Sequence, residues 1–255
     1  MRRFVDLSIY LENDVLSDPP PLAPRIEYQT HKDTIGEFTH LLPGTKPEDF
    51  PDGEAAAAEW VRLTTHSGTH LDAPWHFHST MDGKTGEAKP SITIDQVPLE
   101  WCFQPGVKLD FRHLPDGYVV TAADVEAELK RIGHTLAPLE IVVVNTRAGS
   151  RYGHDDYVNT GCGMGYEATM YLLERGVRLT GTDAWSWDAP SRTQPGNSPR
   201  PAIRAFCGKA TRRAGTSAIA ISRSCTTWRS CRPTALSSAA FRTRFAALRP
   251  DGPAP

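Results

Sequence analysis

The chain has 255 residues, 39% of them hydrophobic, and a formal net charge of -2 at pH 7. This length is enough to bury a substantial core in one large or two small domains. The small net charge gives no sign of binding to nucleic acid or to an anionic membrane. No apolar run is long enough for a transmembrane helix. The five cysteines are scattered without a CxxC pair, so we expect reduced thiols and a cytoplasmic protein.

The first predicted elements are strands separated by a long connection. Residues 4–11 and 59–65 have the apolar patterning of strands. The prolines near residue 20 favour an extended connection, because proline fixes φ and donates no hydrogen bond. Residues 30–55 are polar and contain Gly and Pro, so this stretch is predicted to be a loop.

The middle of the chain alternates between strands and helices. Residues 106–111, 140–145 and 177–180 are predicted strands, and the run EIVVVN suits a strand buried on both faces. A helix is predicted to begin after Thr121, a good N-cap residue. A second helix is predicted over residues 165–175, with Gly176 as its stop. This alternation predicts an α/β fold.

The densest set of reactive side chains is the segment HSGTHLDAPWH, residues 66–76. Gly68 and Pro74 argue against a helix here. If the segment is extended, His66, His70 and Asp72 point to the same side, because strands have a period of two. Two imidazoles and a carboxylate are ligands typical of Zn²⁺ or Mn²⁺. We therefore predict that these three residues bind one or two divalent metal ions.

His76 has the same parity and is predicted to act as an acid/base rather than as a ligand. A bound metal lowers the pKa of its water toward about 7 and makes hydroxide available for attack on a carbonyl. The imidazole of His76 would then move a proton to the departing nitrogen. Thr69, Trp75 and Trp185 are candidates for supporting the ligands or lining a substrate pocket. The alternatives are that Trp185 packs in the core and that any single His is an ordinary core or surface residue.

The segment resembles the H-x-G-T-H-x-D-x-P-x-H signature of the cyclase-like metal-dependent hydrolases, a family that includes bacterial kynurenine formamidase and isatin hydrolase. The resemblance begins at VDLS near the start and extends to GTDAWSWDAP, which ends at Pro190. The longer central loop and GTDAWSWD are closer to isatin hydrolase than to the shorter formamidases.

The resemblance implies a swivelling β/β/α fold with a central mixed sheet. It implies Mn or Zn at His66, His70 and Asp72, acid/base work at His76, and an oligomer, commonly a dimer. It also implies a small-molecule amide substrate, either an aryl formamide such as N-formylkynurenine, as in tryptophan catabolism, or a cyclic amide such as isatin. Two alternatives remain open: an impaired relative that only binds metal or ligand, and a biosynthetic cyclase or dehydratase.

The composition changes after Ser191. Up to that residue the chain has 16 Lys and Arg against 29 Asp and Glu, and beyond it 12 basic residues against one acid. The family pattern would continue with W-E-G-H-K-A-G and a Glu twelve residues past that His. This chain has no His after His154 and no Glu after Glu174. We therefore divide it into a hydrolase domain, 1–191, and an atypical basic tail, 192–255.

Back-translation offers an explanation for the tail. Permitted codons for residues 207–236, read in the neighbouring frame, encode W-E-G-H-K-A-G and the late Glu at the family's spacing. We hypothesise that residues from about Arg192 are an out-of-frame translation. Such a tail is expected to be poorly ordered and to supply no strands, leaving sheet edges unpaired. The alternative, a basic tail that binds a polyanion, is poorly supported because the arginines are scattered without aromatic residues between them.

Overall fold

The computed structural model describes residues 5–82, 87–190, 220–222 and 244–245. The strands are β1 (Tyr10–Leu11), β2 (Arg25–Gln29), β3 (Ala58–Arg62), β4 (Thr80–Met81), β5 (Lys89–Pro90), β6 (Gly106–Asp110), β7 (Val119–Val120), β8 (Ile141–Asn145), β9 (Gly163–Met164), β10 (Leu179–Thr182), β11 (Ala220–Ser222) and β12 (Arg244–Phe245). The α-helices are α1 (Ile35–Leu41), α2 (Pro74–Phe77), α3 (Leu99–Cys102), α4 (Ala122–Ile132) and α5 (Tyr166–Glu174).

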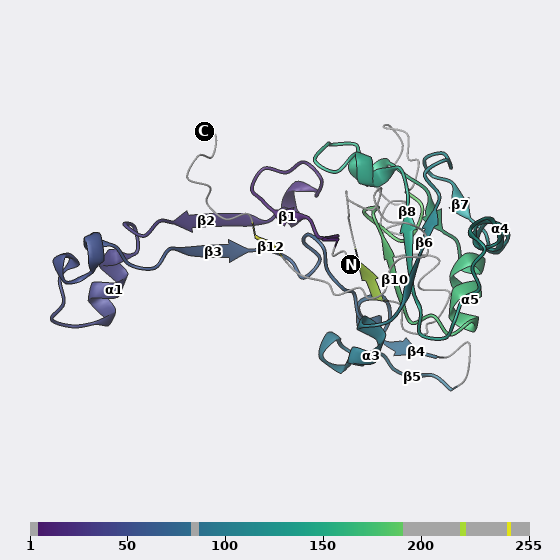
Figure 1. Cartoon of the computed structure of the whole chain (residues 1–255), viewed down its shortest axis with the longest axis horizontal. Coiled ribbons are helices and arrows are strands. Elements are labelled where there is room, and N and C mark those ends of the chain that lie inside the picture. The colour runs from purple at the N-terminus through teal and green to yellow at the C-terminus, as the bar shows by residue number, and fades with distance from the viewer. Residues whose placement is uncertain (1–4, 83–86, 191–219, 223–243, 246–255) are drawn as a thin grey trace.

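The body of the molecule is built on a four-stranded sheet of order β11-β10-β8-β6, in which every pair is parallel. Helices α4 and α5 lie together on one side of this sheet (Figure 1). The mixed α/β class is therefore confirmed. The expected mixed central sheet is instead parallel in all its described strands. Antiparallel pairing occurs in the separate ribbons β2–β3 and β4–β5.

Strand β8 explains why the sheet forms here. All five of its residues are buried, as expected for a parallel strand covered on both faces. Val142 and Val144 pack into the main core with α4 and α5, whereas Ile141 and Val143 point to the opposite face. Leu7 and Leu71 cover that second face. The segment that contains the imidazoles is thus fixed to the sheet on the face away from the helices.

The two long helices agree with the sequence prediction. The Thr121 hydroxyl accepts a hydrogen bond from the Asp124 backbone N–H, and the Asp124 carboxylate accepts one from the Thr121 N–H. This reciprocal capping box satisfies two N–H groups that have no partner within helix α4. Gly133 ends α4 in the left-handed conformation, which costs glycine little.

Two predicted elements differ from the structure. Within the described residues, the first strand is limited to Tyr10–Leu11, because the N–H of Ile9 donates to the Thr69 side chain instead of to a neighbouring strand. The expected loop over residues 30–55 contains helix α1. Ile35, Phe38 and Leu41 have helical spacing in the sequence, but the Gly, Pro and polar residues around them favoured a loop. None of the residues of α1 is buried.

Strands β2 and β3 and helix α1 form an arm, residues 25–62, that extends away from the body (Figure 1). The strands pair antiparallel from Arg25 opposite Arg62 to Gln29 opposite Ala58. All five residues of β3 are exposed. An isolated two-stranded ribbon is only marginally stable in water. Within β2 and β3 only Ile26 is buried, and the Asn13 side chain bonds both its backbone N–H and its carbonyl, so the body supports this ribbon only at its base.

The region after Arg192 contributes two described strands. β11 pairs in parallel with β10, and β12 pairs in parallel with β1. The expectation that this region would supply no strands is therefore wrong at these two places. The other residues of the proposed tail lie outside the described part of the chain. Across the described residues, no helix has both the length and the apolar character needed to cross a membrane.

Candidate metal centre

The loop that carries the imidazoles is bent rather than extended. The Ser67 N–H donates to the Thr64 carbonyl, and the Ser67 hydroxyl accepts from the Thr64 N–H at 3.2 Å, which closes a tight turn. Gly68 follows with φ of +67°, a backbone conformation that residues with a Cβ rarely adopt. The prediction that a period of two aligns the ligands is therefore wrong. The turn brings them together instead.

Pro74 begins the short helix α2, and His76 lies within it. Proline suits this first helical position because its missing N–H would have had no helical partner. The Trp75 N–H donates to the Ile92 carbonyl at 3.1 Å, and the His76 N–H donates to the Ala73 carbonyl at 2.9 Å. These bonds hold the His76 ring over the loop, where its centroid lies 4.1 Å from that of His66.

His66, Asp72 and His76 form a compact group, with one potential ligand atom from each lying within 4.8 Å of the others. Nδ1 of His66 is 2.6 Å from Oδ1 of Asp72. That distance is typical of a charge-assisted hydrogen bond. An ion bound by both atoms would replace the proton that they share.

His70 has the geometry of a ligand held ready for an ion. Its Nδ1 lies 2.9 Å from the Gly68 carbonyl oxygen, so Nδ1 carries the proton and donates it there. Nε2 then has a free electron pair, yet it is buried and has no hydrogen-bond partner. A metal-binding histidine commonly donates its other N–H to a backbone carbonyl in this way.

The pKa of Asp72 shows that the pocket favours a carboxylate. Burial alone would raise this pKa, but the hydrogen bond from His66 and the neighbouring imidazoles of His70 and His76 outweigh burial and hold the pKa well below its ordinary value. Asp72 is only 3% exposed. A buried carboxylate that stays ionised is available to bind a cation.

These residues fit a divalent transition metal. The unpaired Nε2 of His70 lies 3.3 Å from Oδ1 of Asp72. Two ligands with bonds of about 2.1 Å to one tetrahedral ion lie roughly 3.4 Å apart. Imidazole and carboxylate together suit Zn²⁺ and Mn²⁺. The buried, unpartnered nitrogen at ligand spacing is the observation that most favours a metal here.

The remaining predicted site residues lie in different surroundings. Thr69 is buried and its hydroxyl accepts a hydrogen bond from the Ile9 N–H at 3.0 Å, which ties the start of the chain to the ligand loop. Trp75 is 56% exposed beside His76. Trp185 packs against the cluster of Ala148, Tyr157 and Ala184, and its indole N–H donates to Asp18.

One participant was missed at the sequence level. The carbonyl of Gly68 orients His70, whereas in the sequence Gly68 served only as an argument against a helix. Gly68 also lies close to strand β1, because a Cβ at this position would lie 2.7 Å from the Cδ2 atom of Leu11. The signal available in the sequence was the glycine two residues before the histidine.

Comparison with solved structures gives relatives of the same fold. Isatin hydrolase A from Labrenzia aggregata, bound to benzyl benzoate, is 24% identical with a TM-score of 0.60, over 91% of this chain and 84% of that chain. Isatin hydrolase A from Ralstonia solanacearum is 21% identical with a TM-score of 0.61, over 90% of this chain and 81% of that chain. A structure described as a potential metal-dependent hydrolase with cyclase activity is 17% identical with a TM-score of 0.52, over 89% of this chain and 84% of that chain.

Comparison with curated proteins returns no match. A family model described as "Putative cyclase" matches residues 5–189. That range contains the whole ligand loop, helix α2 and strands β1–β10. The chain therefore belongs to this cyclase family, whose solved structural neighbours include isatin hydrolases and metal-dependent hydrolases.

Proposed function

We propose that this protein is a metal-dependent hydrolase that cleaves the C–N bond of a small amide, either a cyclic amide such as isatin or an aryl formamide such as N-formylkynurenine. The observation that carries the proposal is the buried Nε2 of His70, which has no hydrogen-bond partner and lies 3.3 Å from Oδ1 of Asp72. Leaving a buried polar atom unpaired costs about 1–3 kcal/mol, and a metal ion would remove that cost.

His66, His70 and Asp72 would hold one or two divalent ions, Mn²⁺ or Zn²⁺. When bound, such an ion activates water and polarises a carbonyl. Asp72 supplies the negative charge, and its low pKa keeps that charge over the working pH range. The carbonyl of Gly68 fixes the His70 ring so that Nε2 faces Asp72.

His76 is the proton carrier in the proposal. Its ring lies against that of His66, and the residue is exposed, so a substrate can reach it. In hydrolysis, His76 would take a proton from the attacking water as the water oxygen forms a bond to the carbonyl carbon. It would then pass that proton to the departing nitrogen as the C–N bond breaks. The exposed Trp75 on the same helix offers a flat apolar surface for an aromatic substrate.

The test is incubation of the full chain with isatin or N-formylkynurenine in ¹⁸O-labelled water, after loading with Mn²⁺ or Zn²⁺. Hydrolysis incorporates one labelled oxygen into the acid product. A ring-closing or dehydrating enzyme, which the family's cyclase description raises as the alternative, would release water or consume none. Stoichiometric binding of metal without turnover of either compound would favour the alternative, a protein that only binds metal or ligand.

We also propose that the chain consists of a hydrolase domain, 1–191, and an out-of-frame segment from about Arg192. The support is the loss of acidic residues and of histidine after this point. Sequencing the gene across the codons for Ser191 and Arg192 tests the idea. A gene whose neighbouring frame lacks the family's late His and Glu would exclude it. A homodimer is proposed for the whole protein on the family resemblance.

A further inference from the structure

His66 is the least enclosed of the three predicted ligands. Its side chain is 30% exposed, against 7% for His70 and 3% for Asp72. The His70 ring is fixed by its bond to the Gly68 carbonyl. The His66 ring contacts the Asp72 carboxylate and the imidazoles of His70 and His76, which belong to the same centre. The orientation of His66 therefore depends strongly on how its backbone is held.

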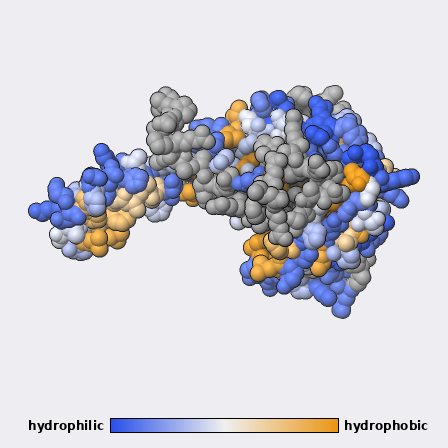
Figure 2. Space-filling view, viewed as in Figure 1, coloured by the Kyte–Doolittle hydropathy of each residue, from blue (hydrophilic) through white to orange (hydrophobic). Residues whose placement is uncertain are grey.

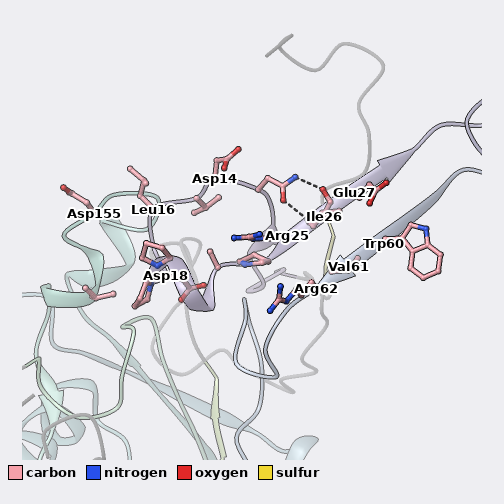
Figure 3. Close-up of a pocket in the computed structure, with 17 residues that line it drawn as sticks. Asp14, Leu16, Asp18, Arg25, Ile26, Glu27, Trp60, Val61, Arg62 and Asp155 are labelled. Carbon is pink, nitrogen blue, oxygen red and sulfur yellow. Dashed lines mark hydrogen bonds between the residues drawn. The ribbon is translucent and has the colours of Figure 1, made fainter. Parts of the chain in front are cut away.

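The strand that leads to His66 does not hold that backbone by packing. All five residues of β3 are exposed, and Leu63, which follows, is 42% exposed. A cavity of about 1200 Å³ borders the last residues of β3, and Figure 3 shows Arg62 at the end of this strand, where the arm joins the body. The arm itself projects from the body as a narrow extension (Figure 2). The backbone of His66 must therefore be fixed from within the loop.

Two hydroxyl groups fix it. The Thr64 hydroxyl oxygen accepts a hydrogen bond from the His66 N–H at 3.2 Å, and the Ser67 hydroxyl oxygen accepts one from the Thr64 N–H at 3.2 Å. The two oxygens lie 3.3 Å apart, so that one hydroxyl donates to the other. Ser67 is only 5% exposed. The pair of hydroxyls thus connects the backbone of the exposed ligand to a buried residue of the ligand loop.

These bonds select one conformation of the turn. The Ser67 N–H donates to the Thr64 carbonyl at 3.1 Å, which places His66 at a central position of a four-residue turn, and such turns occur with several backbone geometries. Serine and threonine hydroxyls that bond to a nearby backbone N–H favour one geometry over the others. In this one, Nδ1 of His66 lies 2.6 Å from Oδ1 of Asp72.

We propose that Thr64 is a positioning residue of the metal centre. Its hydroxyl, joined to that of Ser67, holds His66 in the orientation in which the imidazole and Asp72 bind the same ion. The inference rests on the metal binding that the proposed function requires, and it adds a residue that touches neither ion nor substrate. Thr64 acts on the ion through His66 alone.

The experiment measures the dissociation constant of Zn²⁺ for the full chain by competition with a chromogenic chelator. Thr64→Val keeps the shape of the side chain but removes the hydroxyl, and it is expected to raise the dissociation constant by about tenfold or more, the usual effect of replacing a residue that orients a ligand. Thr64→Ser keeps the hydroxyl and is expected to bind Zn²⁺ as the wild type does.

Thr121→Val is the matched control. The Thr121 hydroxyl caps helix α4, on the face of the sheet opposite to the ligand loop. This variant is expected to lose stability and to leave the dissociation constant of Zn²⁺ unchanged. An equal rise of the dissociation constant in Thr64→Val and Thr121→Val would assign the effect to general stability and overturn the proposal.

A second measurement needs no metal. The proton in the short bond between His66 and Asp72 is expected to give a low-field proton NMR signal in the metal-free chain, identified by its absence from His66→Gln. Thr64→Ser and Thr121→Val should retain this signal, and Thr64→Val should lose it.

The two measurements separate failure of the proposed function from failure of the positioning role. A wild type that shows the signal but binds no Zn²⁺ contradicts the proposed function, and the signal of Thr64→Val then decides the role of Thr64. An unchanged signal in Thr64→Val overturns the positioning role. So does an unchanged dissociation constant in Thr64→Val, or a wild type with neither signal nor binding.

Discussion

Nδ1 of His66 lies 2.6 Å from Oδ1 of Asp72, six residues farther along the chain. The contact exists because the turn at Ser67 and the left-handed Gly68 fold the loop back on itself. His70 reaches the same carboxylate oxygen from the other side at 3.3 Å. One buried carboxylate thus gathers two imidazoles whose spacing in the sequence alone would not bring them together.

Replacing His76 tests its role as a proton carrier. His76→Ala should lower kcat by about 10²- to 10⁴-fold, the usual contribution of a positioned acid or base, while the metal content stays the same. His78→Ala is the matched control, because His78 is exposed two residues away and its ring bonds to Thr80; its activity should stay close to that of the wild type. Loss of metal from His76→Ala would instead make this residue a ligand.

Gly68→Ala should destabilise the fold and disturb the ligand loop. The left-handed backbone costs a residue with a Cβ about 1–2 kcal/mol, and the new methyl group would also meet Leu11 at 2.7 Å. Gly133→Ala is the control for backbone strain alone, since Gly133 has φ of +65° with no atom within 4 Å of the added Cβ. In chemical unfolding, Gly68→Ala should lose more free energy of unfolding than Gly133→Ala. Equal losses in the two variants would mean that the contact with Leu11 does not affect stability.

Thr69 connects the ligand loop to the start of the chain. Thr69→Val keeps the shape but removes the acceptor for the buried Ile9 N–H, so the free energy of unfolding should fall by about 1–3 kcal/mol. Thr69→Ser keeps the hydroxyl and should recover most of that loss. If Thr69→Val and Thr69→Ser lower the free energy of unfolding by the same amount, the hydrogen bond to Ile9 does not account for the contribution of Thr69 to stability.

The raised pKa of the buried Asp183 leads us to predict that the stability of the fold depends on pH. Burial raises its pKa from 3.8 to about 6, against the opposing effect of hydrogen bonds from Thr146 and Asn145. Because the folded chain binds this proton more tightly than the unfolded chain, the contribution to stability is full below about pH 4 and is lost as the pH rises through about 6. This change in the pKa of Asp183 corresponds to a difference of about 3 kcal/mol in the free energy of unfolding between low and high pH.

Asp183→Asn removes that titration with little change of shape. The Asn145 amide nitrogen now donates to Asp183 at 2.5 Å, and its amide oxygen is buried without a partner. Rotation of this amide by half a turn would let it accept from the new asparagine. Unfolding free energies at pH 4 and pH 7 should therefore differ less in the variant than in the wild type. If the unfolding free energy differs between pH 4 and pH 7 by the same amount in both proteins, Asp183 does not cause the pH dependence.

The sequence predicted the features that depend on local chemistry. The cap at Thr121, the buried run of β8 and the stop at Gly176 all correspond to observed elements. Helix α1 was missed because the Gly, Pro and polar residues of the stretch 30–55 favoured a loop, although Ile35, Phe38 and Leu41 have helical spacing. None of the residues of α1 is buried.

The predicted ligands were His66, His70 and Asp72, whereas the group whose ligand atoms all lie within 4.8 Å of one another is His66, Asp72 and His76. The residues of HSGTHLDAPWH were identified from their ligand types and the family signature, whereas the parity argument assumed an extended backbone. Gly68 and Pro74 indicated a break, but a break alone does not specify that His76 would lie 4.1 Å from the His66 ring. That distance depends on α2 and on its contact with Ile92, which comes from elsewhere in the chain.

The most direct test of the account is the metal content of the full chain, measured by mass spectrometry with hydrolysis of isatin and N-formylkynurenine assayed on the same samples. The wild type should bind Mn²⁺ or Zn²⁺ stoichiometrically, lose hydrolysis on chelation and regain it on reloading. Asp72→Asn should bind neither ion and hydrolyse neither compound. Full metal binding by Asp72→Asn, or hydrolysis by the wild type that survives removal of the metal, would contradict the account.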